Sequence, residues 1–496
     1  MRQTYTALSR ADTPVRRAES RLDYGLLRRI FLALSAFLVL LSPLSQDPLA
    51  FAVGGLAPWV ILRLIGRPNM PAAAAYFLIW QWLQVFARVV QSMVDGEPLA
   101  SGLYGPTVEP AYWYSLAGVM VLAVAFRLLL GGLRGPKPEY AQAHLDWNLR
   151  DLCVLYGGTL IFAAACNFGA HSVASLDQPL EAAGNVKILA LMMLFAHVLS
   201  TRRGIGILVG VLVVEIFIGF TGLFSDFKGV FIYIAVAAIA VRIRWTGTMA
   251  VAAVALGSAL VVLAVFWTAV KGEFREYATA SSDSQAIRTS LTNRMTYLGD
   301  RAAAAGTIDW NVAAYQLLAR LGYVDIFGSV IGVQQVSPEP GYMNQWQEAI
   351  EHVLKPRFLF PDKPVLSDTE VFIRLAHADS GEEMRSGTSI SVGYMAENYV
   401  DLGFPGMFAG IFVLGVLTAG ICRYFMTRPL PWIVREGAVL AVLFSIGRTG
   451  VEISLPKYLG ALLMTFIVWA IMAKWGIPLA LKWLGRHRRA SRLQPA

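Results

Sequence analysis

Long apolar runs separated by short polar stretches are the dominant pattern along this chain of 496 residues. Each run holds roughly 20 apolar residues, enough for a helix to cross the hydrocarbon core of a bilayer, which is about 30 Å thick. One polar stretch is long, covering residues 271–388, and backbone outside helices is not expected in lipid. The pattern therefore predicts an all-α polytopic membrane protein with about 12 transmembrane helices and one large loop outside the bilayer.

The predicted spans share an apolar centre and end at charged or proline-containing turns. They cover residues 26–44, 48–64, 71–94, 111–130, 152–170, 187–199, 204–223, 229–241, 248–270, 404–424, 432–446 and 458–479. The chain then divides into a basic tail (1–25), nine spans (26–270), the large loop (271–388), a loop-side helix with three spans (389–480) and a second basic tail (481–496). Apolar residues spaced three and four apart predict helices in the loop at 285–301, 310–321 and 344–354.

Arginine and lysine show which side of the membrane each end of the chain should face. They are concentrated in both tails and in every second short loop, and the alternate loops are nearly free of them. Because cytoplasmic loops are enriched in these residues, we expect both termini inside and the large loop outside. The net charge of +9 is mostly this topology signal, with attraction to anionic inner-leaflet lipid as a second consequence. Scattered charges do not predict a nucleic-acid partner.

Composition supports a membrane protein and argues against several kinds of site. Hydrophobic residues make up 56% of the chain and charged residues 15%, unlike a soluble domain. Cys153, Cys166 and Cys422 lie in or beside predicted spans, so they predict no disulfide framework for the loop. No Cys or His cluster has the spacing of metal ligands, and no glycine-rich phosphate loop is present. We therefore expect neither a metal nor a cofactor.

Polar residues inside predicted spans are costly and therefore informative. Gln81, Gln84, Arg88 and Gln91 follow a spacing of three, four and three, which places them on one face of the third span. This polar stripe either lines a cavity or hydrogen-bonds to neighbouring helices. Arg88, toward the outer end, is the strongest functional candidate. Glu215 in the seventh span is interpreted mainly as a partner for a polar group of a neighbouring helix, with a proton relay as the alternative.

Basic residues on the predicted outer side form a candidate surface for an anionic headgroup. They are Arg88, Lys187, Lys228, Lys271, Arg275, Arg288, Arg294, Arg301, Arg320, Lys355, Arg357, Lys363, Arg374, Arg385, Arg448 and Lys457. Arg contacts phosphate oxygens in pairs, which favours phosphate as the ligand. Contact with lipid headgroups is the alternative explanation for many of them.

Two segments late in the loop carry a specific order of residues. One reads Pro-Arg-Phe-Leu-Phe-Pro-Asp-Lys-Pro (356–364), and the other reads Ala-Glu-Asn-Tyr-Val-Asp-Leu-Gly-Phe-Pro-Gly (396–406) and leads into a span. Both segments resemble the Wzy-type polymerases, which join O-antigen and exopolysaccharide repeat units in bacteria. Many spans with one large late loop, and the turn 225–229 with Ser, a basic residue and Gly, are also similar to that group. Two features depart from it. Asp401 stands where Asn is often found, and the turn from Ser225 to Lys228 is longer than usual.

The resemblance implies glycosyl transfer at the periplasmic face of the bacterial inner membrane, without a nucleotide sugar or an essential metal. The donor would be a glycan on undecaprenyl pyrophosphate, and the acceptor a newly flipped lipid-linked repeat unit. A chain-length regulator and a flippase of the same pathway are the implied partners, besides membrane lipids. For pyrophosphate binding we expect Arg88, Lys228, Arg294, Arg301, Arg357, Lys363 and Arg448. As the base for the acceptor hydroxyl we expect Glu397 first and Asp368 second.

Three other functions stay open on the sequence. A ligase would use the same donor but transfer finished glycan to another acceptor. A transporter or flippase would need polar groups through the membrane midplane, for which Glu215 is the main candidate. A non-enzymatic assembly scaffold would use the loop to bind partners. The loop of roughly 118 residues is far longer than an ordinary connection, which favours the polymerase over the transporter.

Overall fold

The protein is all helical in the part of the chain that the structure, a computed structural model, describes. This part comprises residues 21–101, 105–173, 176–221, 227–279, 289–338, 343–355, 360, 363, 367–376 and 390–485, and it contains no β-strand. The helices before the insert are α1 (Tyr24–Leu41), α2 (Pro48–Ile65), α3 (Ala72–Asp95), α4 (Val108–Leu130), α5 (Pro138–Ala141), α6 (Leu149–Ser172), α7 (Asp177–Gly184), α8 (Val186–Thr201), α9 (Ile205–Thr221), α10 (Lys228–Ala240) and α11 (Gly247–Thr279). The remaining helices are α12 (Leu291–Ala303), α13 (Trp310–Leu321), α14 (Val324–Val336), α15 (Asn344–Leu354), α16 (Asp368–Ala376), α18 (Gly393–Met426), α19 (Trp432–Gly447), α20 (Leu455–Ile471) and α21 (Ile477–Leu484).

Apolar helices of membrane-spanning length support the predicted membrane class. In the described ranges, nine helical segments are long and apolar enough to cross a bilayer. They are Tyr24–Leu44, Pro48–Ile65, Ala72–Asp95, Gly105–Leu130, Leu149–Ala170, Asp177–Thr201, Gly247–Thr279, Gly393–Met426 and Leu455–Leu484. The shorter helices α9, α10 and α19 occupy the other three predicted span positions. Twelve crossings, and the side on which the insert lies, therefore stay predictions.

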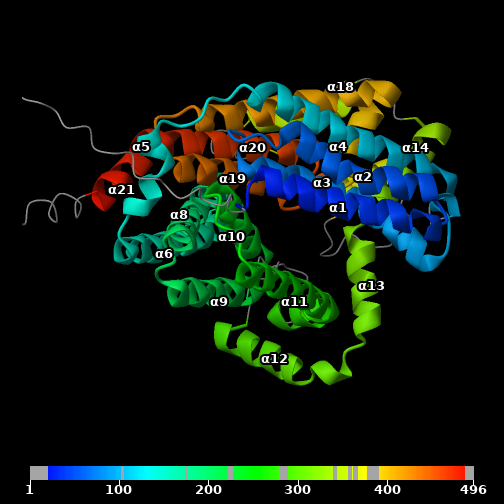
Figure 1. Cartoon of the computed structure of the whole chain (residues 1–496). Helices are drawn as coiled ribbons and strands as arrows, with labels where there is room; N and C mark the ends of the chain where they lie inside the picture. The colour runs from blue at the N-terminus through cyan, green and yellow to red at the C-terminus, as the bar shows by residue number, and fades with distance from the viewer. Residues whose placement is uncertain are drawn as a thin grey trace, which may run out of the picture.

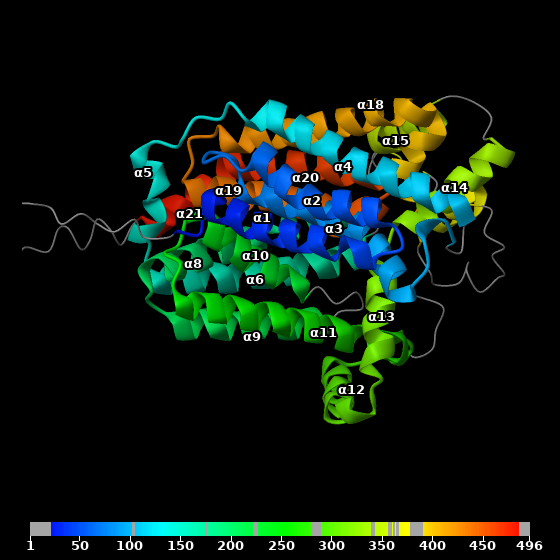
Figure 2. The same ribbon diagram turned by 45° about the vertical axis from the view of Figure 1, so that its right-hand side comes forward.

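The helices form two layers, with α3 and α19 in the interior. Figures 1 and 2 show α1 to α4 beside α18 to α20, with α6 and α8 to α11 against one side of this group. Side chains of α3, α8 and α19 are mostly buried, and the apolar surface of α9 and α11 is mostly exposed. Exposed apolar faces of this kind suit contact with lipid tails.

The two ends of the bundle differ, and we name them here. At the terminal end lie α5, α21 and the first turn of α1, and at the insert end lie α13, α14 and α15 (Figure 2). The predicted basic tails fall almost entirely outside the described residues, which begin at 21 and end at 485. The insert end is where the expected binding residues should meet.

The insert is more helical than the sequence predicted. The helices at 310–321 and 344–354 are confirmed as α13 and α15 with those bounds. α12 begins at Leu291 because the Ser290 hydroxyl accepts a hydrogen bond from Asn293 N (3.2 Å) and caps the helix. The predicted start at 285 lies outside the described residues. α11 continues to Thr279, nine residues past the predicted span limit at 270.

α14 is an insert helix that the sequence analysis did not find. Its sequence is mostly apolar, and its few polar residues do not form one face, so it lacks the three-and-four spacing of a surface helix. Phe327 and Val330 are fully buried, and Thr107 Oγ1 donates to the Gly328 carbonyl (2.7 Å), which fixes α14 against the start of α4. α13 and α14 are bent by 48° and together resemble a broken span or a re-entrant loop. Part of the insert is thus packed into the bundle.

α18 combines the predicted loop-side helix with the predicted tenth span. The two parts meet at Gly403, whose φ of +60° lies in the left-handed region, and at Phe404, which is extended. Glycine adopts this φ without the strain that a Cβ would add. The first part carries Glu397 and Asp401 and faces the insert, and the second part packs along α4.

Candidate anion-binding site

The polar stripe of α3 holds the loop between α19 and α20 in place. Gln84 Nε2 donates to the Thr449 carbonyl (3.0 Å), and Val451 N donates to Gln84 Oε1 (2.8 Å). Gly450 has a φ of +71°, and a Cβ there would lie 1.6 Å from Gln84 Oε1. The loop therefore needs both the amide of Gln84 and a glycine opposite it.

The other glutamines of the stripe also bind neighbouring helices. Tyr394 of α18 donates through its hydroxyl to Gln81 Oε1 (3.2 Å). Gln91 Nε2 donates to the Tyr315 hydroxyl of α13 (3.2 Å). Hydrogen bonding between helices, one of the two interpretations of these glutamines, is thus confirmed.

Arg88, the strongest candidate of the stripe, is buried and paired. Its Nε donates to Asp325 Oδ1 of α14 (2.8 Å), and the Arg88 side chain is 6% exposed. The backbone of Gly322, just past α13, packs against the backbone of Arg88. Arg88 therefore fixes the junction of α13 and α14 to α3, and its remaining N–H donors are the ones that could reach a ligand.

Three cationic side chains act electrostatically on one another at the insert end, and a fourth shares a carboxylate neighbour with one of them. We call these four residues the cation cluster. They are Lys228 at the start of α10, Lys271 and Arg275 in the last turns of α11, and Arg320 in the last turn of α13. Arg320 lies within electrostatic range of both Lys271 and Arg275, and Arg275 also acts on Lys271. Glu452, in the loop that Gln84 holds, lies within range of Arg320 and Lys228.

Two local features of the fold assemble this cluster. Lys271 and Arg275 are one helical turn apart, so the unexpected continuation of α11 places both on one face. α13 packs against α3 on one side and α11 on the other, which brings Arg320 to that face. Like charges four residues apart destabilise a helix by a few tenths of a kcal/mol. A bound anion would remove this repulsion.

Glu452 is a weak counter-charge for the cluster. Burial raises the pKa of its carboxyl above the usual range, and the positive charges of Arg320 and Lys228 only partly oppose this effect. Lys228 also has a second neighbour, because its Nζ lies 5.3 Å from the centroid of the Trp80 ring, within the range of a cation–π contact. Glu452 is therefore only a partial counter-charge for Arg320 and Lys228.

The two predicted catalytic carboxylates meet at the N-terminus of α20. Glu397 is 2% exposed and accepts a hydrogen bond from Leu455 N. Asp368 accepts from Ser454 Oγ through Oδ1 (3.0 Å) and from Lys457 Nζ through Oδ2 (2.6 Å). The positive end of the α20 dipole thus faces both carboxylates. Each carboxylate has a structural partner, whatever its chemical role.

Tyr323 connects the carboxylates with the cation cluster. Its hydroxyl donates to the Val392 carbonyl (2.7 Å) and accepts from Ala396 N (3.2 Å), which places it at the start of α18. Glu397 and Glu452 both act electrostatically on this hydroxyl. The cluster and the carboxylates therefore border one region of the insert end.

The other predicted binding residues lie on different elements. On α12, burial lowers the pKa of Arg294, and Arg301 pairs with Glu273 of α11. Lys363 donates to the carbonyl of His352 in α15, and Arg448 is exposed where α19 ends. Arg357 lies outside the described residues. Of the predicted cations, the structure brings Lys228 to the cluster, and the backbone of Arg88 lies against Gly322, two residues past Arg320.

Two further candidates have structural partners. Asp401 accepts hydrogen bonds from Gln345 N (2.9 Å) and Trp346 N (2.8 Å), so its carboxylate caps the start of α15. Glu215 accepts from the Tyr156 hydroxyl (2.7 Å) and from Lys187 Nζ (2.8 Å). The interpretation of Glu215 as a partner for polar groups of neighbouring helices is thus confirmed.

Sequence reasoning missed part of the cluster. Lys271, Arg275 and Arg320 were included only in the broad set of outer cations, and Glu452 was not considered. The four-residue spacing of Lys271 and Arg275 directly after a span was a usable signal. The position of Glu452 depends on the contact between Gln84 and its loop, which links residues 367 apart in the chain and left no pattern in the sequence.

Comparison with known proteins identifies a family but no characterised relative. Residues 139–425 match the family described as "Domain of unknown function (DUF8712)". No curated protein and no solved structure matches the chain. The match runs from α5 almost to the end of α18 and includes all four residues of the cation cluster, but neither Arg88 nor Glu452. Because it covers more than half of the sequence, the chain belongs to the DUF8712 family.

Proposed function

We propose that this protein is a polysaccharide polymerase that joins oligosaccharide repeat units linked to undecaprenyl pyrophosphate. The observation that carries the proposal is the cation cluster, in which Lys228, Lys271, Arg275 and Arg320 converge from three helices at the insert end. The sequence resemblance to Wzy-type polymerases gives the substrate class. As proposed, the insert end faces the periplasm, and both termini lie in the cytoplasm.

The cluster has the properties that a pyrophosphate leaving group requires. Pyrophosphate gains negative charge as the bond to the sugar breaks, so cations that are already in place lower the barrier. Arg320 and Arg275 can each contact two phosphate oxygens, and the two lysines add compact charges. The backbone of α11 and the packing of α13 position the cations before substrate arrives, which avoids reorganisation during the reaction.

The proposed transfer replaces the bond between the donor sugar and pyrophosphate by a new glycosidic bond. The hydroxyl oxygen of the acceptor sugar attacks the anomeric carbon of the donor glycan. A new glycosidic C–O bond forms, and the C–O bond to pyrophosphate breaks. The hydroxyl proton passes to a carboxylate, and the lipid pyrophosphate leaves as an anion bound by the cluster. Glu397 is proposed as the base and Asp368 as its alternative. Leu455 N–H occupies one Glu397 oxygen, and the second oxygen is the one proposed to take the proton.

A deletion experiment tests this proposal directly. Cells that lack the gene, with and without the wild-type copy, would be compared on a gel of lipid-linked and surface glycan. Single repeat units in place of a ladder, with the ladder restored by the wild-type copy, are expected for a polymerase. A full ladder trapped on the lipid carrier would indicate a ligase, and no outward-facing glycan would indicate a transporter. An unchanged profile would end the polysaccharide proposal.

A further inference from the structure

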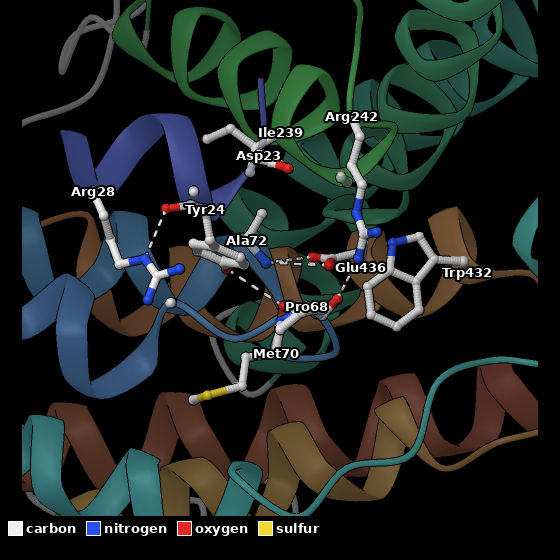
Figure 3. A pocket seen from close by; sticks show the side chains of 13 residues that line it. Asp23, Tyr24, Arg28, Pro68, Met70, Ala72, Ile239, Arg242, Trp432 and Glu436 are labelled. Carbon is white, nitrogen blue, oxygen red and sulfur yellow. Dashed lines mark hydrogen bonds between the residues drawn. The ribbon is translucent and has the colours of Figure 1, made fainter. Parts of the chain in front are cut away.

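A pocket at the terminal end, far from the cation cluster along the bundle, has no role in the proposed reaction. Its cavity of about 170 Å³ lies between the first turn of α1, the connection from α2 to α3, the end of α10 and the start of α19. Figure 3 shows Arg28 and Arg242 on opposite sides of it, with the Tyr24 side chain between them and Trp432 beside Glu436. The pocket therefore joins the two helical layers.

The carboxylates of the pocket are already bound by helix N-termini. Asp23 accepts a hydrogen bond from Leu26 N (3.0 Å) and caps α1. Glu436 is fully buried, and its two oxygens accept from Ala72 N at the start of α3 (3.1 and 3.0 Å). Each negative charge thus faces the positive end of a helix dipole. The two guanidiniums are left as the dominant charges available to a ligand.

The guanidiniums themselves are only partly used by the protein. Arg28 Nε donates to the Tyr24 carbonyl (3.2 Å), and Arg242 NH2 donates to the Pro68 carbonyl (2.7 Å). A guanidinium has five N–H donors, and each of these bonds uses one. Both residues therefore retain donors in the geometry that suits pairs of phosphate oxygens.

The backbone of Arg242 adds an independent indication of function. Its φ is +52°, in the left-handed region that follows the end of many helices and that glycine usually occupies. A side chain at such a position strains the backbone, and strain of this kind is found at binding sites. Here the strained residue supplies one of the two guanidiniums of the pocket.

We propose that this pocket binds the phosphate of a phospholipid headgroup from the inner leaflet. The cavity is smaller than the roughly 300–1,000 Å³ of a drug-sized ligand site but suits a phosphate with its substituents. It lies between apolar helices at the end that carries Trp432 and many arginines, as expected at a membrane–water interface. Basic pockets between membrane helices on the cytoplasmic side recognise lipid headgroups. This inference does not depend on the proposed polymerase activity.

A titration with a short-chain lipid tests the proposal. The full-length protein, purified in detergent and freed of phospholipid, would be titrated with dioctanoyl phosphatidylglycerol, and binding read from the shift of the unfolding temperature. The double variant Arg28→Gln and Arg242→Gly should bind at least about ten-fold more weakly, equal to about 1.4 kcal/mol. The matched control is Arg29→Gln, which removes an exposed charge of the same helix outside the pocket and should bind as the wild type does.

Separate controls show whether the variants fold and whether the bound phosphate belongs to a lipid. Arg242→Gly alone replaces a strained residue by the one that favours its φ, which offsets the lost bond to Pro68, so lipid-free unfolding should be unchanged. Equal lipid binding by the double variant would overturn the proposal. So would an equal loss in Arg29→Gln, which would indicate diffuse attraction to the surface. Inorganic phosphate is the second probe. If the short-chain lipid raises the unfolding temperature no more than inorganic phosphate does, the proposal that the ligand is a phospholipid is overturned.

Discussion

At the residue scale, the site is defined by like charges that act on one another. Lys271 and Arg275 repel each other across one turn of α11, and Arg320 adds a third positive charge from α13. Glu452 offers the opposite charge, but burial disfavours its ionised form. An anion placed among these cations would relieve their mutual repulsion. The effect of pH on these charges can be measured at single residues.

Glu452 should make anion binding depend on pH. Its pKa in the folded protein is raised by burial, so it takes up a proton at a pH where an ordinary glutamate is ionised. Below that pKa the cluster gains one unit of net positive charge, so sulfate, whose charge is constant above pH 4, should bind more tightly as pH falls toward 5. Glu452→Gln should bind sulfate tightly and equally from pH 5 to 7. The shift of unfolding temperature with added sulfate measures both proteins.

The sign of the stability change provides a check on Glu452. Because the folded pKa is raised, this carboxyl favours folding below its ordinary pKa, and that contribution is lost as pH rises through the folded pKa. The wild type should thus lose stability relative to Glu452→Gln as pH rises. A wild-type protein whose sulfate affinity is flat with pH would contradict the placement of Glu452 beside the cluster.

His144, in the connection between α5 and α6, should destabilise the fold in acid. Burial, and next the nearby His197, lower its pKa to about 4, and its Nε2 contacts Ser200 Oγ (3.0 Å). A depressed pKa means that this contribution to stability is complete above the ordinary pKa and is lost as pH falls from about 6.5 to 4. By pH 5, which lies about 1.5 units below the ordinary pKa, the loss should reach about 2 kcal/mol, on the order of 1.4 kcal/mol per pKa unit. Denaturant unfolding of wild type and His144→Gln at pH 7.5 and 5 measures it, and equal slopes with pH would contradict it.

At the element scale, helices with a clear polar face were predictable, and buried or extended helices were not. α13 and α15 were predicted with the right bounds because their apolar residues recur at three and four spacing. α14 is mostly apolar and has no distinct polar face, so its pattern predicted no helix, and the polar residues from Lys271 onward concealed the continuation of α11. That continuation carries Lys271 and Arg275, and α14 holds Arg88 through Asp325. The class of residue was therefore predictable, and the membership of the cluster was not.

Glu397 of α18 contacts the start of α20, and two substitutions separate its structural role from its proposed chemical role. Glu397→Gln keeps an oxygen that can accept from Leu455 N, so α20 should stay capped and the protein should insert normally. The amide cannot take the proton of an acceptor hydroxyl, so polymer should be lost. Glu397→Ala removes both functions and should also lower the unfolding temperature. Wild-type polymer length from Glu397→Gln would reject this residue as the base, and Asp368→Asn would then be tested in the same assay.

At the scale of the whole molecule, the proposed orientation places the two charged sites on opposite faces of the membrane. The cation cluster lies at the insert end, and the pocket with Arg28 and Arg242 lies at the terminal end. The membrane class was open to sequence reasoning because hydropathy reports it directly, and the orientation stays a prediction from the distribution of arginine. The packing of α13 between α3 and α11 was not, because it depends on contacts between residues far apart in the chain.

Cysteine labelling tests the orientation. In a protein whose three cysteines are replaced by alanine, single cysteines would be introduced at Gly299 of α12 and Gly247 at the start of α11. Both positions are exposed, and a Cβ there meets no neighbouring atom, so neither change should disturb the fold. A membrane-impermeant maleimide should label Gly299→Cys in intact cells and Gly247→Cys only after lysis. The reverse pattern would place the insert in the cytoplasm.

The measurement that tests the account most directly is the glycan profile of deletion cells complemented with cluster variants. Lys271→Gln and Arg320→Gln, singly and together, should insert at wild-type levels, since they remove mutual repulsion, but should leave single repeat units on the lipid carrier. Arg63→Gln, an exposed cation stacked over Trp59 outside the cluster, is the matched control and should restore the full ladder. A full ladder from the double variant would contradict the claim that the cation cluster binds the leaving pyrophosphate.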